Sequence, residues 1–77
     1  MTTRLLLHTN MRLLMERCNL RQVDVAWICG VDRRTVVEWL SGRRPIQPYA
    51  SLLLQAFEEG LLSAKWIADR LDTPPPR

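Results

Sequence analysis

The stretch over residues 22–44 constrains the fold more than any other, because it predicts two short helices joined by a tight turn. A helical pattern over residues 22–29 stops at Gly30, where glycine can adopt the left-handed backbone that ends a helix. A second pattern over residues 33–40 follows Asp32, whose carboxylate is placed to cap it. Two helices of this kind meet at roughly 90–120°. The residues predicted to face inward are Val25, Ala26, Cys29, Val31, Val36 and Trp39.

The outward face of the second helix is the candidate functional surface. Arg33, Arg34, Val37 and Glu38 lie opposite the inward residues at helical spacing. Two arginines in a first turn oppose the helix dipole, each at a cost of about 0.3–1 kcal/mol, which a nearby DNA phosphate or guanine edge would offset. We predict that both arginines reach base edges and that Val37 touches a thymine methyl group. Glu38 could accept from cytosine N4 or hold an arginine in place, and we favour the second. A solvated charged face is the alternative interpretation.

This region resembles the lambda-repressor-like helix-turn-helix family, of the Xre and Cro type found among small phage and mobile-element regulators. The similarity spans residues 11–57 and rests on the family spacing of Gln22, Val25, Ala26, Gly30, Val31, Thr35, Val36, Trp39 and Gly42. It implies a compact, all-α, five-helix domain whose motif at 22–41 places one helix in the major groove. Arg21 departs from the family pattern, which usually has Ser or Thr there, and Leu40 stands where many relatives carry Glu.

The resemblance also implies contacts to the DNA backbone. Gln22 would contact the backbone and brace the recognition helix, although an ordinary solvated residue at a helix start is the alternative. Arg43 and Arg44 would lie along the phosphates, with Arg44 also reaching one base. Arg21 and Tyr49 are further candidates for phosphate contacts. For Tyr49, a place at the edge of the core is an equal alternative.

Positive charge is concentrated in the part of the chain that contains this motif. The 77 residues have a net charge of +3, and residues 1–44 hold eight arginines against four acids. Residues 45–77 hold three basic residues against four acidic ones. Ten of the eleven cations are arginine, which suits bidentate contacts to phosphate and guanine better than lysine does. A GC-rich genome would also enrich arginine, but it does not explain the clustering.

Few residues of this chain could support catalysis or hold a metal. Cys18 and Cys29 each fall on an apolar helical stripe, so we predict buried thiols. Together with the lone His8 they do not make an ordinary zinc site. We expect no enzyme, no metal or other cofactor and no small-molecule ligand, because no paired acids or glycine-rich phosphate loop are visible. Without a secretory segment or a membrane-length apolar run, we expect a cytoplasmic protein.

Apolar periodicity predicts three further helices. One runs from about residue 5 to 18, with Asn19 closing it in the left-handed conformation, and its stripe is Leu7, Met11, Leu14 and Cys18. The next runs from about 48 to 59, and its predicted buried stripe is Leu52, Leu53, Ala56 and Phe57. The last lies within 63–71, where Ser63 is the predicted cap and the helix runs from residue 64 to about 71. We expect residues 1–72 to form one domain and 73–77 to be a flexible, proline-rich tail.

The last helix is the candidate dimer interface. Its apolar stripe is Leu62, Trp66, Ile67 and Leu71, although it could instead fold back onto its own domain. Trp27 and Ile28 are predicted to point away from the core, toward another segment or a second subunit. We expect a homodimeric repressor on double-stranded DNA, with half-sites about 34–36 Å apart in an inverted repeat. A protein-binding helical module, antitoxin-like or an adaptor, is the alternative.

Overall fold

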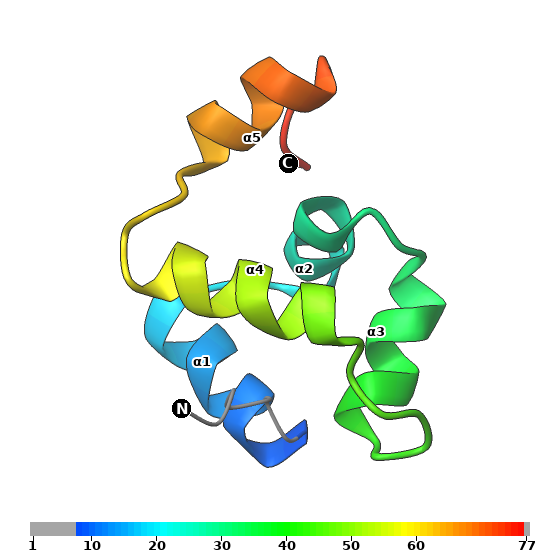
Figure 1. Ribbon diagram of the computed structural model, residues 1–77. Helices are drawn as coiled ribbons and strands as arrows, with labels where there is room; N and C mark the ends of the chain where they lie inside the picture. Colours follow the sequence, from blue (N-terminus) through cyan, green and yellow to red (C-terminus); the bar gives the residue numbers. More distant parts are fainter. Residues whose placement is uncertain (1–7, 77) are drawn as a thin grey trace.

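The computed structural model describes residues 8–76, which form five α-helices and no strand (Figure 1). The helices are α1 (His8–Cys18), α2 (Gln22–Cys29), α3 (Arg33–Leu40), α4 (Pro48–Glu58) and α5 (Ala64–Leu71). The all-α prediction with five helices is therefore confirmed. The predicted start of the first helix near residue 5 lies outside the described residues. None of the helices in residues 8–76 is long and apolar enough to cross a membrane.

The turn between α2 and α3 follows from the backbone freedom of Gly30. Its φ of 68° is left-handed, and a Cβ there would meet nothing within 4 Å, so backbone conformation rather than space favours glycine. The amides of Gly30 and Val31 donate to the carbonyls of Trp27 and Ala26, which closes α2. In Figure 1, α2 is seen nearly end-on while α3 runs up the picture, so the two helices cross steeply.

The core lies where α1, α2, α3 and α4 meet. Its buried apolar residues are Met11, Leu14, Met15, Val25, Ala26, Ile28, Cys29, Val36, Trp39, Leu40, Ile46, Ala50, Leu54 and Ile67. The inward residues predicted for the motif are all in this core or, for Val31, packed against it. Asn19 ends α1 with a φ of 55°, as predicted for an asparagine in that position.

Three local predictions for α2 and α3 are wrong. Ile28 is buried and Trp27 is half-buried against the core, because α2 packs against α4 as well as α3 and therefore has less free surface than an isolated helix pair. Asp32 does precede α3, but its carboxylate makes no capping hydrogen bond and stays exposed to water. Only the backbone carbonyl of Asp32 serves α3, accepting from the amides of Thr35 and Val36.

The predicted buried stripe of α4 is right only in part. The residues that α4 buries are Ala50, Ser51 and Leu54, whereas Leu52 is 54% exposed. Leu53, Ala56 and Phe57 are half-buried, and Leu53 and Phe57 pack against the core. The side that packs carries Ser51, a polar residue that periodicity assigns to solvent. Ser51 is fully buried, and its hydroxyl accepts from Gln55 Nε2 at 2.9 Å. The side with small residues at positions 50 and 51 allows α4 to approach α1 and α2 closely.

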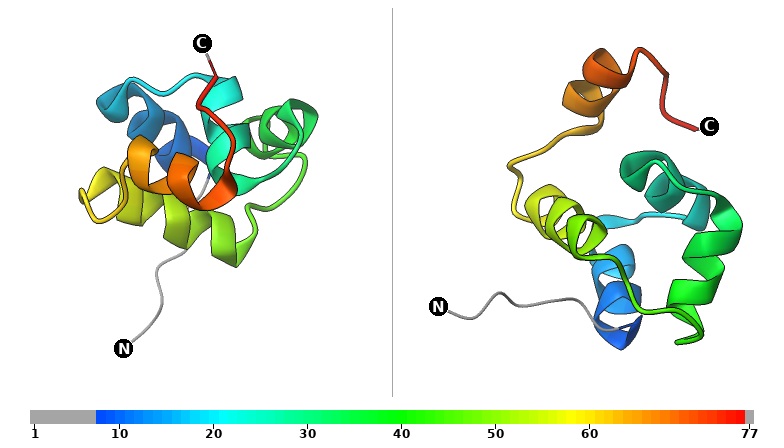
Figure 2. Two further views of the ribbon diagram at one scale, coloured as in Figure 1. Left: turned by 90° about the horizontal axis from the view of Figure 1, so that it is seen from above. Right: turned by 45° about the vertical axis from the view of Figure 1, so that its right-hand side comes forward.

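Helix α5 lies apart from the other helices, and the chain after it returns toward α2 (Figure 2). Ser63 caps α5 as predicted, since its hydroxyl accepts from the amide of Trp66 at 3.1 Å. Ile67 is buried in the core of its own chain, whereas Trp66 and Leu71 are exposed. The guanidinium of Arg70 stacks 4.0 Å from the centre of the Trp66 ring. After Asp72, the tail reaches α2 through Pro76.

Candidate nucleic-acid interface

Helix α3 is anchored by its buried side. Val36, Trp39 and Leu40 lie in the core, and the carbonyl of Leu40 accepts a hydrogen bond of 2.9 Å from Arg12 Nη2 on α1. The last carbonyls of a helix have no partner within it, so Arg12 both satisfies one of them and fixes the end of α3 to α1. Sequence reasoning missed Arg12, because 28 residues separate it from Leu40 and no local pattern links them.

The opposite side of α3 faces solvent, as predicted. Arg33 and Arg34 are exposed in its first turn, and Val37 is 43% exposed one turn further on. Arg33 Nε donates to Gln22 Oε1 at 3.1 Å. The structure thus brings together the residue predicted to brace the recognition helix and one of the two arginines predicted to reach bases. We call Arg33, Arg34 and Val37 the outer α3 face.

Two arginines in this region keep their hydrogen-bond donors open. Arg34 and Arg43 are exposed, and neither makes a hydrogen bond or an ion pair through its side chain with another residue of the described chain, 8–76. A guanidinium carries five N–H donors in a planar fork, which fits a phosphate or the O6 and N7 atoms of guanine. These two side chains are therefore available for an anionic or acceptor-rich partner.

The loop after α3 turns back onto that helix. Gly42 has a φ of 79°, and the amides of Arg43 and Arg44 both donate to the carbonyl of Glu38. Arg44 Nη2 lies 3.5 Å from Glu38 Oε1. Glu38 thus pairs with an arginine of its own chain, which is the role we favoured for it. Arg44 is exposed and Glu38 is half-buried, so water weakens the pair and its contribution to stability is small.

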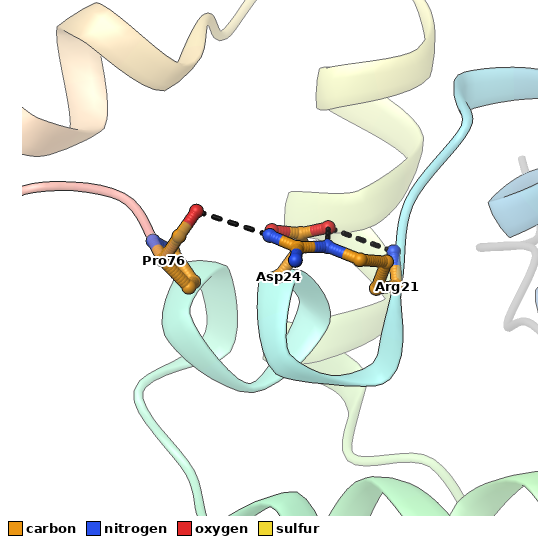
Figure 3. Close-up of polar contacts among 3 residues, drawn as sticks. All are labelled: Arg21, Asp24 and Pro76. Atoms are coloured by element: carbon orange, nitrogen blue, oxygen red, sulfur yellow. Dashed lines mark hydrogen bonds and ion pairs between the residues drawn. The ribbon is translucent and has the colours of Figure 1, made fainter.

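Arg21 is more strongly engaged than the other predicted phosphate contacts (Figure 3). Its Nε and Nη2 donate to the two carboxylate oxygens of Asp24, each at 3.0 Å, and Nη2 also donates to the carbonyl of Pro76 at 3.0 Å. The same carboxylate accepts from the Arg21 amide at 2.8 Å. These hydrogen bonds from Arg21 lower the pKa of Asp24. Asp24 therefore satisfies the start of α2 although Arg21 replaces the usual Ser or Thr.

An open hollow of about 390 Å³ lies at the N-terminal end of α2. It is lined by Arg21, Gln22, Val23 and Arg33. The amides of a first helical turn point outward and carry partial positive charge, so this end of a helix favours an anion. The hollow adjoins the outer α3 face through Arg33. Tyr49, predicted to contact phosphate or to lie at the core edge, is 45% exposed in the first turn of α4.

The two cysteine thiols lie against the core of the described chain. Burial raises the pKa of Cys29 to about 12 and also raises the pKa of the half-buried Cys18, so both stay protonated at neutral pH. Within residues 8–76, no three His, Cys, Asp or Glu side chains gather closely enough to hold a metal ion. The polar groups that α3 and the loop after it present to solvent include the guanidinium groups of Arg33, Arg34 and Arg43.

Comparisons with protein-family models, with curated proteins and with solved structures found no match for this chain.

Proposed function

We propose that this protein is a sequence-specific, double-stranded DNA-binding transcriptional regulator of the lambda-repressor-like helix-turn-helix type. In this proposal it works in the cytoplasm as a homodimeric repressor, and each copy inserts α3 into the major groove of an inverted-repeat operator. Repression needs only occupancy of a promoter, so one small domain is sufficient. No enzymatic activity is part of the proposal.

The observation that carries the proposal is the division of α3 into a buried and an open side. Trp39 and Val36 are fully buried, while Arg33 and Arg34 project from the first turn with no acidic partner among residues 8–76. A helix whose inner side is fixed in a core can hold such side chains at a fixed place. Arginine at the start of an exposed helix reads guanine most simply, through O6 and N7.

The neighbouring groups fit contacts to the phosphate backbone. The Arg43 side chain is exposed, and Gln22 lies beside Arg33. Gln22 and Arg33 both line the hollow at the N-terminus of α2. Contacts of this kind fix register and orientation but carry no sequence information directly. Arg21 and Arg44 would have to exchange a carboxylate of their own chain for a phosphate, so we expect them to contribute less than Arg43.

The test is a set of charge-matched alanine variants measured on duplexes selected from a random-sequence pool. Arg34→Ala should weaken binding to the selected duplex by about 1–3 kcal/mol, or about 5- to 150-fold, and relax its sequence preference. Lys65→Ala removes the same charge from α5 and should leave the affinity and the sequence preference unchanged. Wild-type binding to the selected site by both Arg33→Ala and Arg34→Ala would refute the assignment of α3.

A protein-binding module is a second candidate, because large apolar side chains are exposed outside α3. The exposed residues include Leu52 on α4 and Leu61 before α5, whereas Ile28 gives this function no support, since that residue is buried. Native mass spectrometry of the protein from its cells, with and without duplex DNA, separates the two functions. A heteromeric complex together with no DNA affinity at moderate salt would favour the module.

A further inference from the structure

As far as Phe57, the exposed side of α4 carries no charged residue. From Pro45 to Phe57 the chain has thirteen consecutive residues without Asp, Glu, Lys or Arg, and α4 (Pro48–Glu58) contains most of them. A helix on the surface of a domain ordinarily has a charged or polar outer face. α4 lies along one edge of the molecule, as the left view of Figure 2 shows, so one of its sides has no helix of the described chain against it.

That open side presents an apolar stripe. Tyr49, Leu52 and Ala56 follow one another at spacings of three and four residues, which places them on one helical face. Tyr49 and Leu52 are 45% and 54% exposed, and Ala56 is half-buried. We call these three residues the outer α4 stripe. The helix buries its other side through Ala50 and Leu54, so the outer α4 stripe is not needed for the core of a single chain.

We propose that the outer α4 stripe is the surface through which two copies of this chain associate. The inference rests on the proposed function in one respect, since a regulator on an inverted repeat requires a second copy. The choice of partner rests on charge. In a two-fold symmetric dimer, a residue near the axis meets its own counterpart, so any charged residue there would meet a like charge. A stripe without charges avoids this repulsion.

The charges that flank the stripe support the same arrangement. Glu58 and Glu59 stand at the end of α4 and are both exposed, so charged groups border the uncharged face at that end. Protein interfaces commonly have an apolar centre depleted of charge and a polar rim. Tyr49 adds a large, rigid side chain of the kind that often dominates binding energy. Leu52, near the middle of the helix, is the best candidate to lie at the axis.

The structure offers less for association through α5. Ile67, at the centre of the stripe predicted for that role, is buried in its own chain, and Arg70 covers one face of the Trp66 ring. Leu71 remains exposed at the end of α5, so it supplies a direct comparison with Leu52. In Figure 1, α5 lies on the far side of α2 and α4 from α3, whereas the start of α4 lies beside α3. A dimer axis at α4 therefore keeps the two α3 helices closer to it.

Sedimentation velocity tests the proposal on three variants, each of which replaces a leucine of nearly the same exposed fraction. Leu52, Leu13 and Leu71 are 54%, 51% and 50% exposed, and each lies on a different helix. We expect the wild type to dimerise in the micromolar range and Leu52→Glu to raise the dimer Kd by about 30-fold or more. Leu13→Glu and Leu71→Glu should sediment as the wild type does. Circular dichroism confirms that each variant keeps its helices, and Leu52→Ala repeats the test for any that does not.

A mixing experiment tests whether Leu52 faces its own counterpart. Leu52→Glu and Leu52→Lys should each be monomeric alone, and an equimolar mixture should recover a dimer, because opposite charges then meet across the axis. A wild type that stays monomeric throughout the micromolar range would overturn the proposal. The proposal would also be overturned if Leu71→Glu were monomeric while Leu52→Glu remained dimeric. It would be overturned as well if the mixture of Leu52→Glu and Leu52→Lys stayed monomeric.

The same variants separate this inference from the proposed function. On a duplex selected from a random-sequence pool, Leu52→Glu should lose the tighter binding of a two-half-site duplex and keep the affinity for one half-site. If no duplex is selected but Leu52→Glu still disrupts the dimer, the DNA-binding proposal fails and this inference stands. If a duplex is selected and Leu52→Glu dimerises as the wild type does, only this inference fails.

Discussion

Replacing Ile67 with alanine should release α5 from the body of the protein without unfolding the rest. Ile67 is 5% exposed and is the one residue of α5 that the structure buries. Leu62 packs against the core just before α5, and Pro76 accepts one exposed hydrogen bond from Arg21 just after it. The docking of α5 therefore depends mainly on a single apolar side chain.

The expected loss follows from the atoms removed. Ile67→Ala deletes three carbon groups, each worth about 0.8 kcal/mol when buried, which gives about 2.4 kcal/mol. Any cavity left behind would add to this loss, but a helix at the edge of the domain can settle into the space. A loss of about 2.4 kcal/mol lowers the docking equilibrium of α5 by about 50-fold.

Native-state hydrogen exchange measures this loss locally. The backbone amide of Ile67 donates to the carbonyl of Ser63 in the wild type. In Ile67→Ala, the amide at this same position should exchange about 50-fold faster than it does in the wild type. The amide of Val25 in α2 reports on the core and should keep its protection. Leu71→Ala, at the exposed end of the same helix, is the matched control and should change neither amide.

Two results would refute this reasoning. If both amides lost protection equally, α5 would be an integral part of one cooperative unit. If neither lost protection, contacts other than Ile67 would hold α5 in place.

Further predictions concern the ends of α2 and α3 and the buried thiol. Asp24 has a lowered pKa in the folded chain, so its carboxylate stabilises the fold. The difference in the free energy of unfolding between the wild type and Asp24→Asn should therefore be largest at neutral pH. That contribution should shrink below the ordinary value of 3.8 and vanish below the lowered pKa, as urea titrations at each pH would show. Arg12→Leu removes the bond to the last carbonyl of α3 and should cost about 1–2 kcal/mol in the same assay, whereas Arg12→Lys should restore part of it. Arg43→Ala should weaken all duplexes alike and reduce the slope of log K against log salt by about one, measured by fluorescence anisotropy. Cys29, with its pKa raised to about 12, should react with a thiol reagent at pH 8 much more slowly than Cys18 does.

Local signals made the centre of the fold predictable. The bounds of α2 and α3 match the sequence prediction because Gly30 and the inward residues act within a few positions of each other. Ser63 and Asn19 were predictable for the same reason, since a cap or a left-handed residue is decided by its own neighbours. The exposure of Arg33 and Arg34 followed once the buried side of α3 was identified.

Contacts between distant segments could not be predicted in this way. The Arg12 bond to the Leu40 carbonyl and the Arg21 bond to the Pro76 carbonyl join residues 28 and 55 positions apart. A carbonyl leaves no side-chain pattern that identifies its partner. The orientation of α4 failed for a different reason, because the side that packs carries the polar Ser51, which periodicity assigns to solvent.

The failed prediction for α4 and the proposed association have one physical origin. A helix that must bury one side and leave the other in water shows a single apolar stripe, and periodicity then identifies the core. A helix that must bury both sides, one against its own chain and one against another, has apolar residues on each, as α4 has Leu54 on one side and Leu52 on the other. Leu52 has the sequence pattern of a core residue because, under the proposed association, it is buried between the two copies. The short loop between Leu40 and Pro48 joins α3 to α4, so an axis fixed at Leu52 would also set the separation of the two outer α3 faces. Register on DNA and self-association would then both depend on the loop that joins α3 to α4.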